Sequence, residues 1–301
     1  MNVVEVKFEM NITITGNLGS GKSSIGKILK EKGYEIVSTG NIFRQLAMDK
    51  GLSVEEFNKQ VNEAAAKGDR SVDKMIDDTT AKIGRERDNI MFDSRLAWNF
   101  VPDSFKVFVI TDIDEASRRV FNDSVRANSE SYESQEACKK ALVHRQEMET
   151  VRYQEIYHID YYDMSNYNLV IESTNAAPAE IAEEILDKME EYKEGKFSKL
   201  MELNPSSIYP TKESATAGTS DEIVVNEVNG TWFVKKGEEA IQNAVQAGKK
   251  FVSVKVDATF QPELLSEEVY KTYEAKTGIT FKKYPTSALY EEHGFMNFST
   301  L

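Results

Sequence analysis

The stretch Gly16-Asn17-Leu18-Gly19-Ser20-Gly21-Lys22-Ser23 decides how this chain folds. It matches the pattern G-x-x-x-x-G-K-[ST] at every fixed position. The apolar and β-branched residues 11–15 before it predict a buried strand, and the apolar positions 25, 28 and 29 after it share one face of a predicted helix. A glycine-rich turn that matched by chance would not need a strand and a helix on its two sides. The sequence therefore predicts a phosphate-binding loop.

The residue types of this loop suit a nucleoside triphosphate. Glycines allow backbone angles that other residues avoid, so the loop can direct its N–H groups at phosphate oxygens, next to the positive end of the following helix. Lys22 can reach the β and γ phosphates, and the Ser23 hydroxyl can bind Mg²⁺. The expected cofactors are thus ATP and Mg²⁺. The residues expected to hold ATP are Gly16, Asn17, Leu18, Gly19, Ser20, Gly21, Lys22, Ser23 and Ser24.

Strands and helices alternate along the first two thirds of the chain. Further strands are predicted at 35–40, 89–93, 105–110 and 167–171, and helical patterns lie between them and at 177–193. This alternation predicts an α/β fold, a P-loop NTPase parallel sheet with helices on both faces. Ligands of such sheets bind beyond the carboxyl ends of the strands, where Gly16, Gly40 and Asp93 fall.

Asp93 is predicted to be a carboxylate partner of Mg²⁺, because it follows a short apolar strand and a phosphate-binding loop requires such an acid. The alternative is an ordinary aspartate that begins a turn at a strand end.

The arginines gather around the same predicted edge of the sheet. Guanidinium groups grip phosphate oxygens in pairs, so a set of them suits phosphoryl transfer, whereas solvated surface charge is the alternative for any single one. Residues 122–143 are polar and separate two arginine groups, which is typical of a mobile lid; a solvent-facing loop followed by a helix is the plain alternative. The arginines are Arg44, Arg95, Arg118, Arg119, Arg126, Arg145 and Arg152.

Composition excludes several classes of partner. With 50 acidic and 37 basic residues the 301-residue chain carries a formal net charge of −13, which repels nucleic acids and anionic lipid, so neither a nucleic acid nor a membrane is an expected partner. No apolar run approaches the roughly 20 residues of a membrane helix, and the N-terminal residues lack a secretory pattern. The single cysteine, Cys138, excludes an internal disulfide and fits a reducing compartment, so the expected location is cytoplasmic.

Several motifs, of which the loop is the first, follow one another in a defined order along residues 1–190. They are residues 16–23, residues 37–44, Asp69-Arg70 with Asp73, Ser94-Arg95-Leu96-Ala97, Arg145 with Glu149, Arg152-Tyr153, residues 157–160 and residues 167–171. In order and spacing this part of the chain resembles the nucleoside monophosphate kinases, and most of all the archaeal-type cytidylate kinases.

The resemblance implies a role for each matching residue. Lys22 and the loop amides would hold the ATP phosphates, and Ser23 would bind Mg²⁺. Arg95 would bridge the acceptor and the transferred phosphate, and no protein base is implied because the attacking phosphate oxygen is already anionic. The lid-side arginines that would close over the reacting groups are Arg119, Arg145 and Arg152. The acceptor pocket would comprise Ser38, Gly40, Arg44, Asp69 and Asp73, with Arg44 on the acceptor phosphate.

The chain departs from the family pattern at a few positions. Asp93 is the strand-end acid, and Ser94 stands where a glycine is usual. Asn17-Leu18 lies where proline is common. Gln146 and Asn168 replace a usual Glu and Asp. These changes leave the phosphate chemistry intact and bear on the identity of the acceptor base.

A charged, glycine-broken stretch at 190–196 predicts a boundary between domains at 1–195 and 196–301. The second is predicted to be a small α+β domain, with a hairpin at Asn229-Gly230, a helix at 238–247 and a strand at 251–256. It resembles a divergent ParB-like domain in residues 203–206, 229–234 and 237–252. Gly237 is followed by Glu238-Glu239-Ala240 in place of the family's basic pair, so a scaffold, homodimer or protein-partner role is expected. The aromatic residues after 261 are expected to form a core or an interface.

The sequence thus predicts ATP-dependent phosphoryl transfer to a nucleoside monophosphate, CMP or dCMP. One alternative is another small-molecule P-loop kinase that acts on dephospho-coenzyme A or an alcohol, with Asp93 as general base. The other is a regulatory protein that senses a nucleotide and binds a partner through its second domain. The three histidines are scattered and one cysteine cannot complete a zinc site, so no metal cluster is expected.

Overall fold

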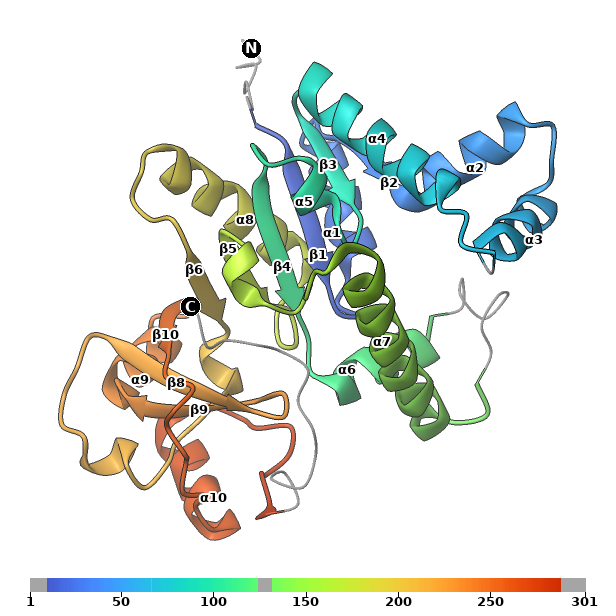
Figure 1. Ribbon diagram of the computed structural model, residues 1–301. Helices are drawn as coiled ribbons and strands as arrows, with labels where there is room; N and C mark the ends of the chain where they lie inside the picture. The colour runs from blue at the N-terminus through green and yellow to red at the C-terminus, as the bar shows by residue number, and fades with distance from the viewer. Residues whose placement is uncertain (1–9, 66, 124–131, 288–301) are drawn as a thin grey trace. The chain divides into compact units, whose positions relative to one another are not determined.

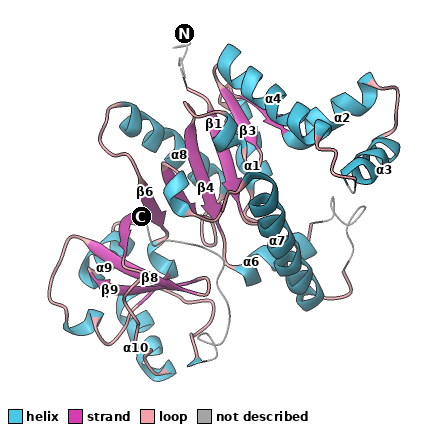
Figure 2. Cartoon of the chain, in the orientation of Figure 1, coloured by secondary structure: helices cyan, strands magenta, loops and turns pink. Residues whose placement is uncertain are grey.

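The computed structural model describes residues 10–65, 67–123 and 132–287, in which strands and helices alternate (Figures 1 and 2). The chain forms two compact units, one of residues up to 15 together with 22–107, the other of residues 16–21 together with 108–301. The predicted domain boundary at 195/196 lies inside the second unit and stays a prediction.

The first unit holds a parallel sheet in the order β2-β3-β1, with Val37 paired to Phe92 and Thr13 paired to Phe92 on the other side. Helix α1 packs on β2 and β3, α2 packs on β2, and α3 and α4 pack on α2. Its elements are β1 (Ile12–Gly16), α1 (Lys22–Glu31), β2 (Glu35–Ser38), α2 (Thr39–Asp49), α3 (Val54–Ala65), α4 (Ser71–Glu86), β3 (Ile90–Asp93) and α5 (Ala97–Phe100).

Asn11, directly before β1, connects the end of α4 to the start of β3. Its buried amide donates to the carbonyls of Gly84 and Arg87 at 3.1 and 2.8 Å and accepts from the N–H of Ile90 at 2.9 Å. It therefore satisfies backbone groups at the end of α4 and at the start of β3, which would otherwise be costly to bury. A capping box begins α3: the Ser53 N–H donates to the Glu56 carboxylate at 3.0 Å, and the Glu56 N–H donates to the Ser53 hydroxyl at 3.2 Å.

Strand β4 (Phe105–Ile110) passes from the first unit into the second. In the second unit β5 pairs with β6 in parallel, and the sheet continues as β6-β10-β8-β9-β7 with mixed strand directions. The other elements are α6 (Ile113–Phe121), α7 (Gln135–Tyr157), β5 (Leu169–Glu172), α8 (Pro178–Lys193), β6 (Leu200–Leu203), β7 (Ile208–Tyr209), β8 (Ile223–Val228), β9 (Thr231–Lys236), α9 (Glu238–Gln246), β10 (Val252–Val256) and α10 (Glu267–Thr277).

The predicted α/β class and the mostly parallel strands are confirmed. The hairpin is also confirmed, because Asn229 and Gly230 both take positive φ angles between β8 and β9, as a tight hairpin turn requires. Of the aromatic residues after 261 that the structure describes, Tyr270, Tyr273 and Phe281 are buried in a core and Tyr284 is half-buried. The sequence pattern missed the short strands β6 and β7, which have too few residues to show a period.

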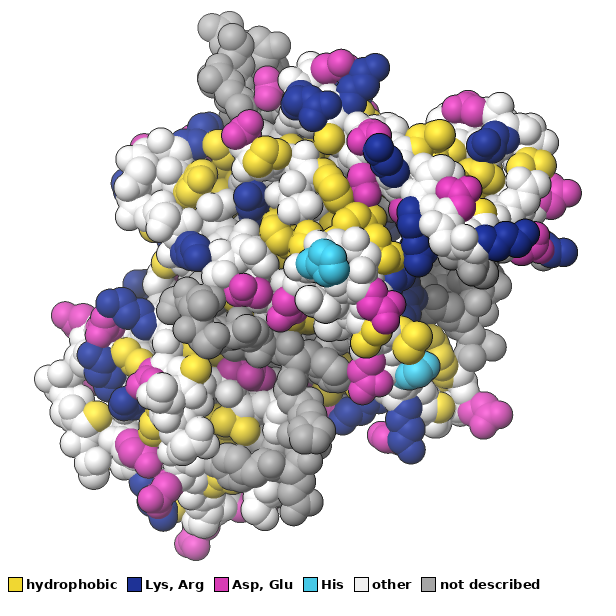
Figure 3. All heavy atoms as spheres, viewed as in Figure 1, with side chains coloured by type: hydrophobic (Ala, Val, Ile, Leu, Met, Phe, Trp, Pro, Cys, Tyr) yellow, Lys and Arg dark blue, Asp and Glu magenta, His cyan; other side chains and the backbone are white. Residues whose placement is uncertain are grey.

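On the face shown in Figure 3, acidic and basic side chains are interspersed over most of the area. Among the described residues, no helix combines the length and the apolar character needed to cross a bilayer.

Glu202 on β6 makes stability depend on pH. Its carboxylate is buried, accepts a hydrogen bond from Ser253 at 2.6 Å and lies 3.6 Å from the ammonium group of Lys188. Burial raises its pKa to about 7 in spite of these two partners. The folded state therefore keeps a proton that the unfolded state loses at lower pH, and this contribution to stability is lost as the pH rises through about 7.

We expect Glu202→Gln to remove this dependence. Relative to the wild type, the free energy of unfolding of the variant should rise by roughly 1–3 kcal/mol between pH 5 and pH 8. Urea denaturation at both pH values measures the difference, and Glu190→Gln, which changes an exposed acid on α8, is the control. If the free energies of unfolding of Glu202→Gln and the wild type change equally between pH 5 and pH 8, Glu202 is not the source of the pH dependence.

Candidate nucleotide-binding site

The predicted phosphate-binding loop, residues 16–21, follows β1 and leads into α1. A Cβ at Gly16 would lie 2.3 Å from the carbonyl oxygen of Val109, and a Cβ at Gly19 would lie 2.8 Å from that of Ala116. Gly19 also has a φ of +77°, which disfavours other residues. The glycines are thus required by the close approach of β4 and α6 as well as by the shape of the loop.

Asn17 and Leu18, which stand where proline is common, attach the loop to the residue after β4 and to α6 and α7 within the second unit. The buried Asn17 amide donates to the carbonyl of Thr111 at 2.7 Å and accepts from the Thr111 N–H at 3.0 Å. Leu18 is buried among Ala116, Val120 and Leu142 of α6 and α7. Both side chains therefore fix the loop to β4, α6 and α7 of the second unit.

A second set of contacts reaches the loop from the end of β5. The Ser173 hydroxyl donates to the carbonyl of Ser20 at 3.0 Å and is hydrogen-bonded to the hydroxyl of Thr111. The Arg119 guanidinium donates to the carbonyl of Ser173 at 2.6 Å and lies 3.5 Å from the carbonyl of Gly19. Arg119, predicted as a lid-side residue, thus contacts the loop itself.

Glu115 holds Arg119 in this position. Its buried carboxylate accepts from Nε of Arg119 at 2.9 Å and from Nε of Arg118 at 2.9 Å. Burial alone would raise the pKa of Glu115, but the hydrogen bonds from the two arginines and the charge of Lys282 outweigh it and lower the pKa to about 2. Glu115 is therefore ionised throughout the physiological pH range.

In the first unit, strand register collects predicted site residues at the carboxyl edge of the sheet. Asp93 pairs with Ile14 of β1 on one side and with Ser38 of β2 on the other. The Thr15 hydroxyl, directly before the loop, donates to the carbonyls of Ser94 and Arg95 at 3.2 Å each. The turn that carries Arg95 is thereby fixed to the end of β1.

The ATP-side residues of the first unit, Lys22, Ser23 and Ser24, form the first turn of α1, in which no acidic residue lies. Ser23 and Ser24 are exposed. The hydroxyl of Ser23 and the half-buried carboxylate of Asp93 are oxygen donors of the type that Mg²⁺ prefers. No group of three or more potential metal-binding His, Cys, Asp or Glu side chains occurs among the described residues.

The predicted acceptor residues surround the start of α2 and of α4. Ser38 caps α2 by accepting from the Asn41 N–H at 3.1 Å, and the exposed Arg44 is hydrogen-bonded to the Asn41 side chain one turn into the helix. The exposed Gly40 lies against the Arg44 guanidinium, so a side chain there would contact it.

Asp69 and Asp73 lie before and in the first turn of α4. Asp69 accepts from the Ser71 N–H at 2.8 Å, which lowers its pKa. Asp73 lies 3.7 Å from the Arg70 guanidinium. These acids organise the helix start, and a role toward the acceptor stays a prediction.

Arg145 and Arg152 lie two turns apart on α7, and Arg145 pairs with Glu149 at 3.1 Å. Of the lid predicted at 122–143, residues 135–143 are the beginning of α7, while Arg126 and residues 124–131 lie outside the described residues.

The sequence analysis missed Thr111, Ser173 and Glu115, as well as the anchoring part played by Asn17. Thr111 and Ser173 directly follow β4 and β5, so a polar residue after each strand of a parallel sheet was the signal that could have revealed them. Glu115 lies three and four positions before Arg118 and Arg119 in α6, a spacing that allows the ion pairs, whereas its contact with Lys282 joins distant parts of the chain and had no signal.

The part of the chain that carries these residues is similar in sequence to known proteins. Residues 11–175 match the model of the cytidylate kinase-like family. A cytidylate kinase of Methanococcoides burtonii is 32% identical over 166 residues, which cover 55% of this chain and 88% of that protein. An S-adenosylmethionine-dependent nucleotide dehydratase of Lacinutrix mariniflava is 31% identical over 195 residues, which cover 64% of this chain and 38% of that protein.

Solved structures add little. A shikimate kinase from Acinetobacter baumannii in complex with shikimate aligns at 17% identity with a TM-score of 0.41, covering 62% of this chain and 96% of that one. The family match covers more than half of the 301 residues, and this chain belongs to the cytidylate kinase-like family.

Proposed function

We propose that this protein transfers the γ-phosphate of ATP to a nucleoside monophosphate, with CMP or dCMP as the acceptor. The observation that carries the proposal is the complete phosphate-binding loop, held from its protein side by Asn17 and Arg119, in a chain of the cytidylate kinase-like family. Phosphoryl transfer depends on positioning and on neutralising charge, and a loop fixed in this way supplies positioning before the substrate arrives.

On the ATP side, the backbone N–H groups of residues 16–21 and the start of α1 would bind the triphosphate, with Lys22 on the β and γ phosphates. Ser23 and Asp93 would hold Mg²⁺, which when bound neutralises charge on the phosphates. Ser24 lies in the same helical turn and would add a hydroxyl.

On the acceptor side, Ser38, Gly40 and Arg44 would receive the monophosphate at the start of α2, where the helix end favours an anion. Asp69 and Asp73 would contact the nucleoside. Arg95 would bridge the acceptor phosphate and the transferred group, and Arg119, Arg145 and Arg152 would neutralise the charge that the reaction develops. No protein base is required, because the attacking oxygen of a monophosphate is anionic at neutral pH.

A coupled assay of ADP production over CMP, dCMP, UMP, AMP, dephospho-coenzyme A and simple alcohols tests the proposal. We expect CMP or dCMP to give the highest kcat/KM. Turnover of an alcohol or of dephospho-coenzyme A alone would overturn the nucleotide acceptor and make Asp93 a candidate general base. Tight ATP binding without turnover of any acceptor would identify a nucleotide sensor instead.

Lys22→Ala tests the role of the loop. We expect kcat/KM to fall by about 10²–10³-fold, because a charge that stabilises the transferred phosphate is lost. Lys27→Ala, which removes an exposed lysine from the same helix, is the matched control and should act like the wild type. Equal activity of the two variants would show that the loop does not hold the reacting phosphates.

A further inference from the structure

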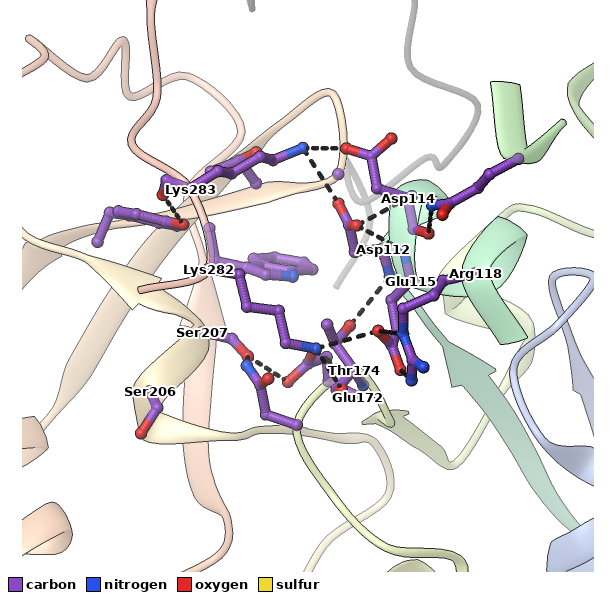
Figure 4. Close-up of a pocket in the computed structure, with 16 residues that line it drawn as sticks. Asp112, Asp114, Glu115, Arg118, Glu172, Thr174, Ser206, Ser207, Lys282 and Lys283 are labelled. Carbon is purple, nitrogen blue, oxygen red and sulfur yellow. Dashed lines mark hydrogen bonds and ion pairs between the residues drawn. The ribbon is translucent and has the colours of Figure 1, made fainter. Parts of the chain in front are cut away.

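A segment from the far end of the chain reaches the contacts behind the phosphate-binding loop. The Lys282 ammonium group lies 3.2 Å from Oε2 of Glu115 and donates to the carbonyl of Thr174 at 3.2 Å. The adjacent Lys283 binds Asp114 at 2.6 Å and lies 3.6 Å from Asp112. Figure 4 shows both lysines extending toward the beginning of α6, across a pocket of about 230 Å³.

Aromatic stacking fixes the segment that carries these lysines. The Phe281 ring stacks on the Tyr209 ring with centroids 4.3 Å apart and an interplanar angle of 20°. The Phe281 N–H donates to Glu274 of α10 at 2.6 Å, and the Tyr209 hydroxyl donates to the carbonyl of Lys283 at 2.7 Å. The backbone on both sides of Lys282 is therefore hydrogen-bonded, on one side to the half-buried Glu274 and on the other to the buried Tyr209, and these bonds fix the segment that brings Lys282 to Glu115.

The same carboxylate leads to the loop. Glu115 receives Lys282 on Oε2 and Arg119 on Oε1, and Arg119 in turn contacts the carbonyls of Gly19 and Ser173. Thr174, whose carbonyl binds Lys282, also accepts from the N–H of Asp112 at the start of α6. A continuous series of charge-assisted hydrogen bonds thus joins the C-terminal segment to the backbone of the phosphate-binding loop.

We propose that Glu115 is a positioning residue for the phosphate-binding loop and that Lys282 completes its set of partners, so that the C-terminal region sets the affinity of the loop for ATP. The inference rests on the proposed function to the extent that the loop binds a nucleoside triphosphate. It gives residues 196–301 a part in the kinase site that their distance in sequence from the loop does not suggest.

Charge and positioning predict opposite effects of changing Glu115, which makes the proposal testable. A carboxylate near a triphosphate repels it, so Glu115→Gln would strengthen nucleotide binding if only charge mattered. If Glu115 positions Arg119 against the loop, the same change weakens binding, because an amide is a poorer partner for a guanidinium group. Lys282→Met should weaken binding on either ground, so Glu115→Gln is the decisive variant.

The experiment is calorimetric titration of the full-length protein with Mg²⁺ and a non-hydrolysable ATP analogue. We expect binding to weaken about tenfold in Glu115→Gln and about threefold to fivefold in Lys282→Met, with no further loss in the double variant, because Lys282 acts through Glu115. Lys282→Arg should retain most of the affinity. Lys283→Met, which breaks the neighbouring ion pairs with Asp114 and Asp112, is the matched control and should bind like the wild type.

Several results would overturn the inference. Glu115→Gln that binds as tightly as the wild type or more tightly would refute positioning. Equal affinity of Lys282→Met and the wild type would remove the C-terminal region from the site, and this variant keeps the test valid should Glu115→Gln fail to fold, because the Lys282 side chain is 52% exposed. The titration needs no acceptor, so a protein that binds the analogue but phosphorylates no monophosphate would refute the proposed function alone.

Discussion

The site depends on the hydrogen bonds that fix the phosphate-binding loop to the residues that follow β4 and β5 and to α6. A loop rich in glycine is flexible by itself, and a flexible loop must lose conformational entropy when it binds a phosphate chain. Here the paired hydrogen bonds between Asn17 and Thr111 and the donors of Arg119 and Ser173 satisfy the loop's inward groups. The loop is therefore ordered by these contacts during folding, so less conformational entropy is lost when it binds a ligand.

Within each unit, polar residues lie at the carboxyl ends of strands. Thr111 follows β4, Ser173 follows β5, and in the first unit Asp93 and Ser38 end neighbouring strands. The chemistry of the site follows from this topology more than from any single element. Residues after 196 contribute to the second unit in two ways. Strand β6 pairs with β5 in the sheet, and Lys282 contacts Glu115 of α6.

Much of this could be predicted from the sequence, for identifiable reasons. The loop pattern predicts β1 and α1 because apolar residues on its two sides have the spacing of a strand and of a helix. The Asn229-Gly230 turn predicts a hairpin because few dipeptides tolerate two positive φ angles. The contacts of Arg119 with Gly19 and of Lys282 with Glu115 could not be predicted, since they join residues 100 and 167 positions apart. Asn17 was read as a departure from a family pattern, whereas in the fold its side chain supplies two hydrogen bonds that proline could not make.

We propose that the phosphate-binding loop holds the triphosphate of ATP, while arginines hold a nucleoside monophosphate with its phosphate in line with the γ-phosphate. The most direct measurement is the affinity of a bisubstrate analogue in which adenosine and cytidine are joined through a chain of phosphates. We expect this analogue to bind far more tightly than ATP or CMP alone. We also expect Arg44→Ala to remove most of this increase in affinity. If the analogue binds no more tightly than ATP itself, the protein does not hold the two nucleotides together in this way.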